Sequence, residues 1–296
     1  GDVGKTINVN SGSLFLTATS GTVNTITQPT SFSQAASGSW TMNSVVYNSD
    51  TDVLETSHVQ EKYDISGLTD PEKSFYPSAS RPAHGVIWNA DGSALYVCDS
   101  NEDRIYQYPC STAYDVGTAS TASSTTVYFG SQDSQPHAIA WNNDGTRLFM
   151  LGNASGRIYQ YDTSTPYSAA NLMYNSVYFS VTGQSYTRVG MCFSTDGTRC
   201  WIIDQHYVRI YEYELSTPWS INTASYQNNM LGIVSYDSYP YGVAVSPDGT
   251  KLFVSGKQHS KIYQWSLSTA NTLSSASYVG ASPSLAGAAA NPEGIC

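Results

Sequence analysis

The chain has 296 residues, which is long enough for one large all-β domain or for two smaller domains. Only 12% of the residues are charged and the formal net charge is −10, so we expect no nucleic-acid partner, because phosphate-binding surfaces depend on clustered Lys and Arg. The sequence contains no run of 18 apolar residues, so we expect no insertion into a membrane.

The first segment, residues 1–38, differs from the rest of the chain. Apolar and polar residues alternate at 6–10, 14–17 and 23–27, between Ser-Gly turns, and this alternation predicts two or three short strands. So few strands cannot bury a core of their own. We therefore expect an N-terminal β arm that packs on the remaining chain or docks to a partner.

The next segment, residues 39–81, is interpreted as a degenerate copy of a unit that recurs later. The segments 45–47 and 53–55 predict strands, and the run 63–66 aligns with the ends of later third strands, such as 161–164. The segment lacks a good first strand and an Asp-Gly turn. We therefore expect an incomplete unit here.

Residues 82–291 contain a repeat with two landmarks in one register. Asp-Gly pairs begin at Asp91, Asp144, Asp196 and Asp248, which are 52 or 53 residues apart. A run of the type Ile-Tyr-Gln-Tyr keeps the same step at 105, 158, 210 and 262. These landmarks define repeats at 82–135, 136–187, 188–239 and 240–291.

Each repeat predicts four short strands, and the last repeat shows them most clearly. Its first two strands, 243–245 and 252–254, flank a Ser-Pro-Asp-Gly-Thr run in which Gly can adopt a positive φ. The third strand is the aromatic and β-branched run 262–265, and a weaker fourth strand includes 278–279. Its counterparts in the second and third repeats are predicted at 177–179 and 231–234. Four antiparallel strands in a unit of roughly 40 to 50 residues are typical of propeller blades. The predicted fold class is therefore an all-β β-propeller of four-stranded blades.

The end of the chain, residues 292–296, aligns with the start of the first strand at 240–244. Propellers commonly close by letting one terminus complete a blade that the other terminus began, which leaves no exposed sheet edge. We therefore expect five blades in residues 39–296, closed by N- and C-terminal strands. The alternative is that further repeats follow Cys296.

The repeat resembles a known family. The runs Gly242–Val254 and Lys261–Trp265, with Leu215–Ser220 one unit earlier, are similar to YVTN-type propeller repeats. Related Ser-Thr-Pro-Trp tandem repeats occur in bacterial surface proteins and in virion proteins of tailed phages. The resemblance covers residues 82–280, and it implies a propeller and, in most members, a structural or binding role.

Candidate ligand-binding residues follow the third strands. Tyr114, Tyr167 and Trp219 occupy this place in three repeats and could stack on sugar rings. They could equally fill the gaps between neighbouring blades, which is the commoner use of large aromatic side chains.

Catalytic and metal-binding motifs are sparse. His84 and His137 occupy equivalent positions at the start of first strands, but two imidazoles are too few for a tight metal site. The run 99–103 is rich in oxygen ligands yet lacks the EF-hand pattern, and no nucleophile elbow or phosphate loop is present. We therefore expect no catalytic residues, no metal and no cofactor.

The five cysteines do not indicate a disulfide framework. Cys192 and Cys200 flank one Asp-Gly turn and could face each other across a hairpin. The simpler interpretation is that all five are small buried strand residues.

From these observations we expect a non-enzymatic structural or adhesive module on a phage virion, in a decoration, tail or fibre protein. Its expected partners are other virion or surface proteins, through the arm at residues 1–38, with carbohydrate and a second copy of the chain as further candidates. The first alternative is a bacterial cell-surface or surface-layer protein, which would be extracellular. The second alternative is a metal-dependent propeller lactonase or lyase.

Overall fold

The computed structural model describes residues 83–122 and 125–285, Phe75 and Ile295, and also the backbone of five short strands in the first part of the chain. The chain divides into two compact units, Gly1–Asp64 and Ile65–Cys296, and each is described by itself. Within the described residues, no helix has the length and hydrophobicity needed to cross a membrane.

The first unit contains two small antiparallel sheets. Strands β1 (Thr6–Val9), β2 (Gly12–Thr19) and β3 (Thr22–Thr27) form a three-stranded sheet. Strands β4 (Val45–Asn48) and β5 (Val53–Thr56) form a two-stranded sheet. All five strands coincide with segments in which the sequence predicts strands. A docking role for residues 1–38 stays a prediction.

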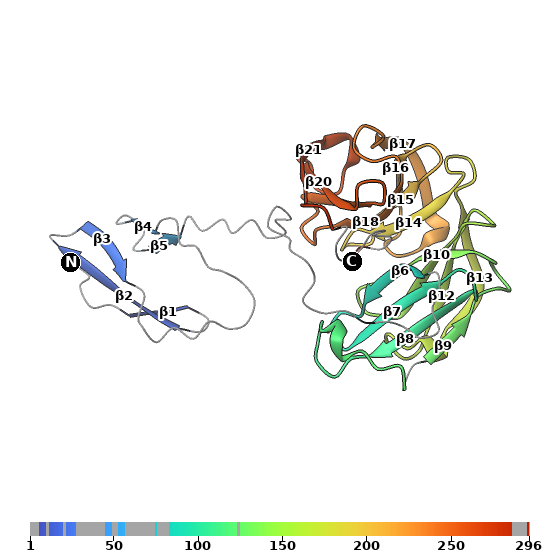
Figure 1. The fold of residues 1–296 in the computed structure, drawn as a ribbon, viewed down its shortest axis with the longest axis horizontal. Coiled ribbons are helices and arrows are strands. Elements are labelled where there is room, and N and C mark those ends of the chain that lie inside the picture. Colours follow the sequence, from blue (N-terminus) through green and yellow to red (C-terminus); the bar gives the residue numbers. More distant parts are fainter. Residues whose placement is uncertain are drawn as a thin grey trace. The chain divides into compact units, whose positions relative to one another are not determined.

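The second unit contains four antiparallel sheets of four strands each, so the predicted all-β propeller with four-stranded blades is confirmed (Figure 1). The first blade consists of β6 (Ala83–Trp88), β7 (Ala94–Asp99), β8 (Arg104–Pro109) and β9 (Thr125–Tyr128). The second consists of β10 (Pro136–Trp141), β11 (Arg147–Gly152), β12 (Arg157–Asp162) and β13 (Met173–Ser180). The third consists of β14 (Arg188–Phe193), β15 (Arg199–Asp204), β16 (Arg209–Leu215) and β17 (Ala224–Gly232). The fourth consists of β18 (Pro240–Val245), β19 (Lys251–Gly256), β20 (Lys261–Leu267) and β21 (Ala276–Ala281).

Within each blade the strands are ordered as they occur in the sequence, and each pairs with the next. The first strands β6, β10, β14 and β18 lie side by side in succession, so they form the inner wall of the propeller (Figure 1). A short 3-10 turn precedes each outermost strand: η1 (Val116–Thr118), η2 (Ala169–Asn171), η3 (Ile221–Thr223) and η4 (Leu273–Ser275).

The prediction of five blades is wrong, because the described residues of the second unit form four. Strands β4 and β5, which were expected to belong to a shared blade, pair with each other in a separate sheet of the first unit. Their segment lacks the first strand and the Asp-Gly turn that begin every complete blade. Of the predicted closing strand at 292–296 the structure describes only Ile295, whose backbone nitrogen lies beside Gly242 of β18.

The outermost strands of the second and third blades begin earlier than the sequence predicts. The prediction placed them at 177–179 and 231–234, whereas β13 begins at Met173 and β17 at Ala224. Much of each strand is exposed, so these residues carry little of the hydrophobic pattern by which buried strands are found in a sequence.

Hydrophobic cores lie between neighbouring blades. Tyr96 and Ile105 of the first blade pack with Met150 of the second, and Trp201 of the third packs with Trp265 of the fourth. All five side chains are at most 2% exposed. Burying a large apolar side chain contributes about 1.5–3 kcal/mol, so these shared clusters are the main force that holds blade to blade.

A polar contact at one register position also joins successive blades. In each of the first three blades, the third residue of the Ile-Tyr-Gln-Tyr landmark accepts a hydrogen bond from the first backbone N–H of the next blade's 3-10 turn. The three pairs are Gln107 with Ala169 at 3.0 Å, Gln160 with Ile221 at 3.3 Å, and Glu212 with Leu273 at 2.6 Å. This position therefore connects blades as well as forming part of a strand.

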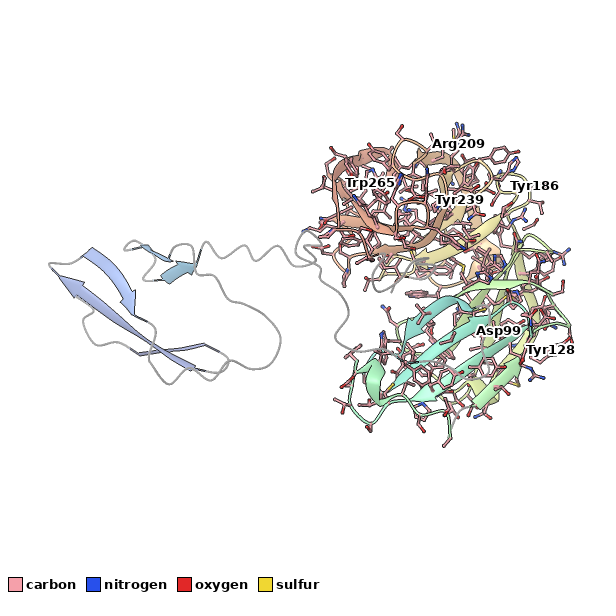
Figure 2. All side chains as sticks on the ribbon, viewed as in Figure 1. Asp99, Tyr128, Tyr186, Arg209, Tyr239 and Trp265 are labelled. Carbon is pink, nitrogen blue, oxygen red and sulfur yellow. The ribbon has the colours of Figure 1, made fainter. Side chains whose placement is uncertain are left out.

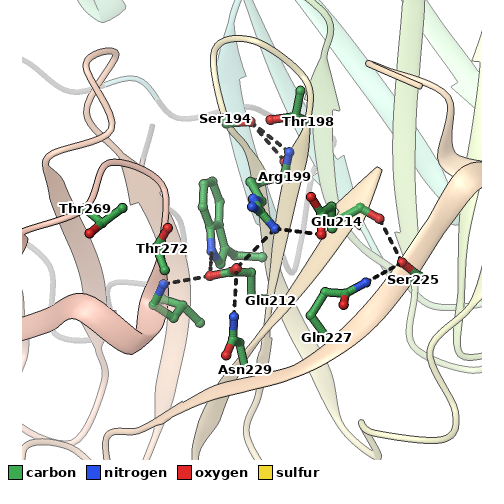
Figure 3. A network of polar contacts seen from close by, with 12 residues as sticks. Ser194, Thr198, Arg199, Glu212, Glu214, Ser225, Gln227, Asn229, Thr269 and Thr272 are labelled. Atoms are coloured by element: carbon green, nitrogen blue, oxygen red, sulfur yellow. Dashed lines mark hydrogen bonds and ion pairs between the residues drawn. The ribbon is translucent and has the colours of Figure 1, made fainter. Parts of the chain in front are cut away.

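Glu212, the one charged member of this set, is fully buried and lies at the centre of a larger network (Figure 3). It accepts hydrogen bonds from Trp201 Nε1 at 3.4 Å and Asn229 Nδ2 at 3.2 Å. Arg199 Nη1 lies 3.6 Å from Glu212 Oε1 and 3.3 Å from Glu214. A buried carboxylate is stable only when it is paired and hydrogen-bonded in this way.

We predict that Glu212→Ala destabilises the protein by about 3 kcal/mol, because it leaves two buried N–H donors, on Leu273 and Trp201, without an acceptor. Glu212→Gln should cost less than about 1 kcal/mol, because a glutamine already makes this contact at the two preceding blade junctions. Urea denaturation of both variants measures the difference. Equal destabilisation by the two substitutions would contradict the proposed role of the side-chain oxygen.

Candidate functional site

An aromatic side chain packs on the Asp-Gly turn in each of the first three blades. Tyr114, Tyr167 and Trp219 adopt φ values of 56–57°. Their backbone N–H groups donate to the carbonyl of the turn glycine at 2.8–2.9 Å. A Cβ atom placed on that glycine would come within about 2.5 Å of the ring in all three blades. The turn therefore needs glycine both for its positive φ and for the space that the ring occupies.

The aspartate that begins each turn fixes the turn itself. Asp248 Oδ1 accepts hydrogen bonds from the backbone N–H and the hydroxyl of Thr250 and from the hydroxyl of Ser246. These bonds, that of Ser246 first, lower the pKa of Asp248 to about 2. The repeated aspartates thus serve the turns, as side chains of this type commonly do.

A second set of aromatic residues ends the innermost strands of the same three blades. The pairs are Trp88 with Tyr114, Trp141 with Tyr167, and Phe193 with Trp219, with ring centroids 5.7, 5.5 and 5.5 Å apart. In the fourth blade Val245 and Asn271 occupy the corresponding places. The fourth blade therefore adopts the same four-stranded fold without an aromatic pair at these two positions.

These six rings line one cavity of about 680 Å³ at one end of the propeller's inner wall. The remaining lining consists mainly of aliphatic and small residues from the four innermost strands and Ile295. A volume of this size falls within the range of about 300–1,000 Å³ that is usual for small-molecule sites. The cavity is therefore the candidate functional site, and we call it the aromatic cavity.

The aromatic cavity is electrically neutral. Among the described residues that line it, none is Lys, Arg, Asp, Glu or His, and the titratable ones are Tyr114, Tyr167 and Cys192. Burial raises the pKa of Tyr167 and that of Cys192 above their ordinary values, so both side chains are uncharged at pH 7.

One hydrogen-bond donor at the aromatic cavity lacks an acceptor. The indole nitrogen Nε1 of Trp141 is buried, and no acceptor for it occurs in the described part of the chain. Buried N–H groups are nearly always paired in native proteins, so such an atom calls for an explanation.

The opposite end of the innermost strands carries a different set of side chains. The rings of His84 and His137 lie with centroids 4.4 Å apart and planes tilted by 31°, and Tyr241 lies parallel to His84 at 6.3 Å. His137 Nδ1 lies 2.9 Å from the carbonyl oxygen of Arg188, so Nδ1 carries the proton and donates it. The structure thus brings together the two histidines that the sequence pairs. Nowhere in the described residues do three or more His, Cys, Asp or Glu side chains form a group that could hold a metal.

The four cysteines within the described residues are free thiols. In the hairpin register Cys192 faces Trp201, whereas Cys200 faces Phe193, so the two cysteines are not directly opposed. Cys98 and Cys200 are buried strand residues, as the simpler interpretation expects, whereas Cys110 and Cys192 are partly buried and Cys110 lies just after β8. In the run 99–103, Asp99 Oδ1 accepts from the backbone N–H groups of Asn101 and Glu102 and so closes its own turn.

The three predicted stacking residues therefore meet at one cavity, while their ligand-binding role stays a prediction. The sequence analysis missed their partners Trp88, Trp141 and Phe193. A signal for them existed, because each stands three residues before the aspartate of its turn. Other exposed aromatic side chains do not line the cavity, among them Tyr128 and Tyr186, which are 54% and 70% exposed (Figure 2).

No protein-family model and no curated protein matches the sequence. Among solved structures, the chain is similar to a protein of unknown function from Desulfotomaculum acetoxidans, with 15% identity, a TM-score of 0.45, and coverage of 67% of this chain and 55% of that chain. It is also similar to a Bacteroides fragilis protein provisionally named a 6-phosphogluconolactonase, with 15% identity, a TM-score of 0.45, and coverage of 70% of this chain and 57% of that chain. The likeness to the periplasmic gluconolactonase of Pseudomonas aeruginosa has 13% identity, a TM-score of 0.46, and coverage of 72% of this chain and 58% of that chain. The chain thus spans little more than half the length of these proteins.

These findings contradict the prediction of a non-enzymatic virion module. Two of these similar proteins carry lactonase names, one of them provisionally, and neither name refers to a phage. The expectation that the protein is not an enzyme is corrected accordingly, and the lactonase alternative agrees better with the findings. Likenesses this distant concern the fold, so what the site can do must be argued from its own residues.

We predict that Gly145→Ala destabilises the protein by about 1–3 kcal/mol, because alanine is strained at the φ of +70° found there and its Cβ would meet the ring of Tyr167. Gly183→Ala is the matched control, since an added Cβ meets nothing within 4 Å at that position. Thermal unfolding followed by circular dichroism compares the two variants. A control variant as unstable as Gly145→Ala would contradict the explanation.

Proposed function

We propose that this propeller binds a small uncharged cyclic molecule, of the sugar or sugar-lactone class, in the aromatic cavity. The observation that carries the proposal is the convergence of six aromatic rings from three blades on one cavity: Trp88, Tyr114, Trp141, Tyr167, Phe193 and Trp219. Small-molecule sites are typically concave and lined by apolar and aromatic side chains with few polar groups.

The chemistry of the lining matches such a ligand. The C–H groups on the face of a sugar ring are apolar and pack on the flat face of Trp or Tyr, while the ring's oxygen atoms accept hydrogen bonds at its edge. The cavity supplies such flat aromatic faces from three blades. A sugar ring or a lactone ring has an apolar face of this kind.

The repeat shows that the fold does not require these rings. The fourth blade has Val245 and Asn271 where the other blades have aromatic pairs, and its four strands form the same antiparallel sheet. Because the fold forms without them, the large aromatic side chains at these six positions can serve a role beyond packing. That role, in this proposal, is to bind the ligand in the cavity that they line.

We predict that Trp219→Asn lowers the affinity for a bound sugar or lactone about tenfold, because stacking on one aromatic ring contributes on the order of 1 kcal/mol. Asparagine is chosen because Asn271 holds the equivalent place in the fourth blade with a φ of 61°. Isothermal titration with methyl β-glucoside and with glucono-1,5-lactone measures the change. Tyr128→Ala, on the outer strand β9, is the control and should leave the affinity unchanged.

The site of binding can be located independently through Trp219, which lines the aromatic cavity. A bound ring should slow oxidation of Trp219 by N-bromosuccinimide, followed by mass spectrometry of peptide fragments. If neither compound binds, or if Trp219 is not protected by a compound that does bind, the proposal is wrong.

A second candidate function is lactone hydrolysis, and the observation that favours it is the close pair of His84 and His137, whose ring centroids lie 4.4 Å apart. With the proton of the neutral tautomer on Nδ1, Nε2 is the ring nitrogen of His137 that would act as the general base. Nε2 would take a proton from water as the water oxygen adds to the lactone carbonyl. The ring C–O bond would then break, and the departing oxygen would take up that proton to give a hydroxy acid.

If the second candidate is right, the protein hydrolyses glucono-1,5-lactone above the spontaneous rate in a pH-stat assay. His137→Gln should then lower the rate about 100-fold or more, the contribution expected of a general base. Trp219→Asn tests whether the aromatic cavity contributes to the same reaction. A rate equal to the spontaneous one in the wild-type protein excludes this activity for this lactone.

A further inference from the structure

A second group of exposed rings belongs to the third blade. Tyr186 and Tyr207 are 70% and 51% exposed, and His206 is exposed between them (Figure 2). The ring centroid of His206 lies 5.0 Å from that of Tyr186 and 4.8 Å from that of Tyr207. These three residues, which we call the tyrosine platform, lie in the turns before β14 and after β15. Phe193, at the opposite end of β14, lines the aromatic cavity, so the platform is a separate surface.

The backbone of both turns is fixed by buried charged side chains. Asp204, at the end of β15, accepts hydrogen bonds from the backbone N–H groups of Tyr186, Thr187 and Tyr207. Arg188 donates from Nη1 to the carbonyl of Tyr186 at 3.0 Å. Asp204 and Arg188 are both buried. Because hydrogen bonds to charged groups are strong, these contacts hold the two exposed tyrosines in one arrangement.

The second turn also contains a strained residue. Val208, directly after Tyr207, has a φ of 53°, which β-branched residues rarely adopt. The same positive φ occurs in the other blades at Asp103, Gly156 and Ser260. Val208 packs against the hydrophobic cluster between the third and fourth blades, and this packing offsets the strain. Residues held in such conformations are concentrated at binding sites, so the strain directs attention to this turn.

The fold does not require aromatic rings at these positions. The second blade has Ser134 and Ser155 at the places of Tyr186 and Tyr207, 52 residues earlier. Its turn is held in the same manner, because the buried Asp133 accepts from the backbone N–H of Ser155 at 2.7 Å. The platform is therefore an addition to a turn that forms equally well with serine.

Rigid and exposed tyrosine faces suit the rings of a neutral polysaccharide. The apolar face of a sugar ring packs on an aromatic face, and a fixed backbone reduces the ordering that binding must impose. The charged groups that hold the turns are buried, and Arg209 next to them has its Nη1 3.4 Å from the sulfur of Met230. The net charge of −10 also repels an anionic polymer.

We infer that the tyrosine platform is a carbohydrate site distinct from the aromatic cavity, at which the third blade binds a neutral polysaccharide. Tyr186 and Tyr207 contact separate sugar units of the same polymer, so their weak individual contributions combine. The inference does not depend on what the aromatic cavity binds.

The test is native affinity electrophoresis of the full chain in gels that contain hydroxyethyl cellulose, galactomannan or no polymer. We expect at least one polymer to retard the wild-type protein. Tyr186→Ser and Tyr207→Ser should each weaken binding about fivefold, and the double variant should migrate as in the polymer-free gel. Serine is chosen because the second blade carries it at both positions, and thermal unfolding checks that the variants remain folded.

Two variants serve as controls. Tyr128→Ala removes an equally exposed ring from the outer strand β9, and Trp219→Asn alters the aromatic cavity. Both should be retarded as strongly as the wild-type protein. A wild-type protein that neither polymer retards, or a folded double variant that is still retarded, overturns the inference. Loss of retardation in Trp219→Asn alone would assign the polymer to the aromatic cavity and overturn it as well.

Discussion

A glycine with positive φ in each Asp-Gly turn is the constraint on which both the blades and the aromatic cavity depend. Gly92, Gly145, Gly197 and Gly249 all have φ values of 70–71°. This conformation reverses the chain between the first two strands, and the missing Cβ leaves room for the residue that comes after the third strand. Where that residue is aromatic, its ring is held at the cavity, so one local feature produces both the fold and the site.

The blades could be predicted because their signals are local and repeated. The Asp-Gly pairs and the Ile-Tyr-Gln-Tyr landmark lie within a few residues of the strands that they define. The fifth blade was predicted wrongly because its evidence was an alignment of two distant segments, which does not reveal hydrogen-bonding partners. In the structure β4 pairs with β5, and the described residue Ile295 lies beside β18. Likewise, only three-dimensional contacts reveal that Glu212 joins two blades and that Trp141 Nε1 has no acceptor among the described residues.

Composition was a poor guide to function for a physical reason. An acidic chain rich in Ser, Thr and Tyr indicates exposure to the medium, but the same composition serves a structural module and an enzyme equally well. What distinguishes these functions is the chemistry at the two ends of the innermost strands. One end presents neutral aromatic faces around a cavity, and the other presents the neighbouring imidazoles of His84 and His137. The proposed binding and the proposed proton transfer thus fall to separate sets of residues.

The central claim is that the aromatic cavity receives an uncharged ring. The most direct measurement is a crystal structure of the full chain grown with a saturating concentration of methyl β-glucoside. The account predicts density for the sugar ring among Trp88, Trp141 and Trp219, with the face of the ring packed on at least one of these indole rings. An empty aromatic cavity in a crystal that binds the sugar elsewhere on the protein would contradict it.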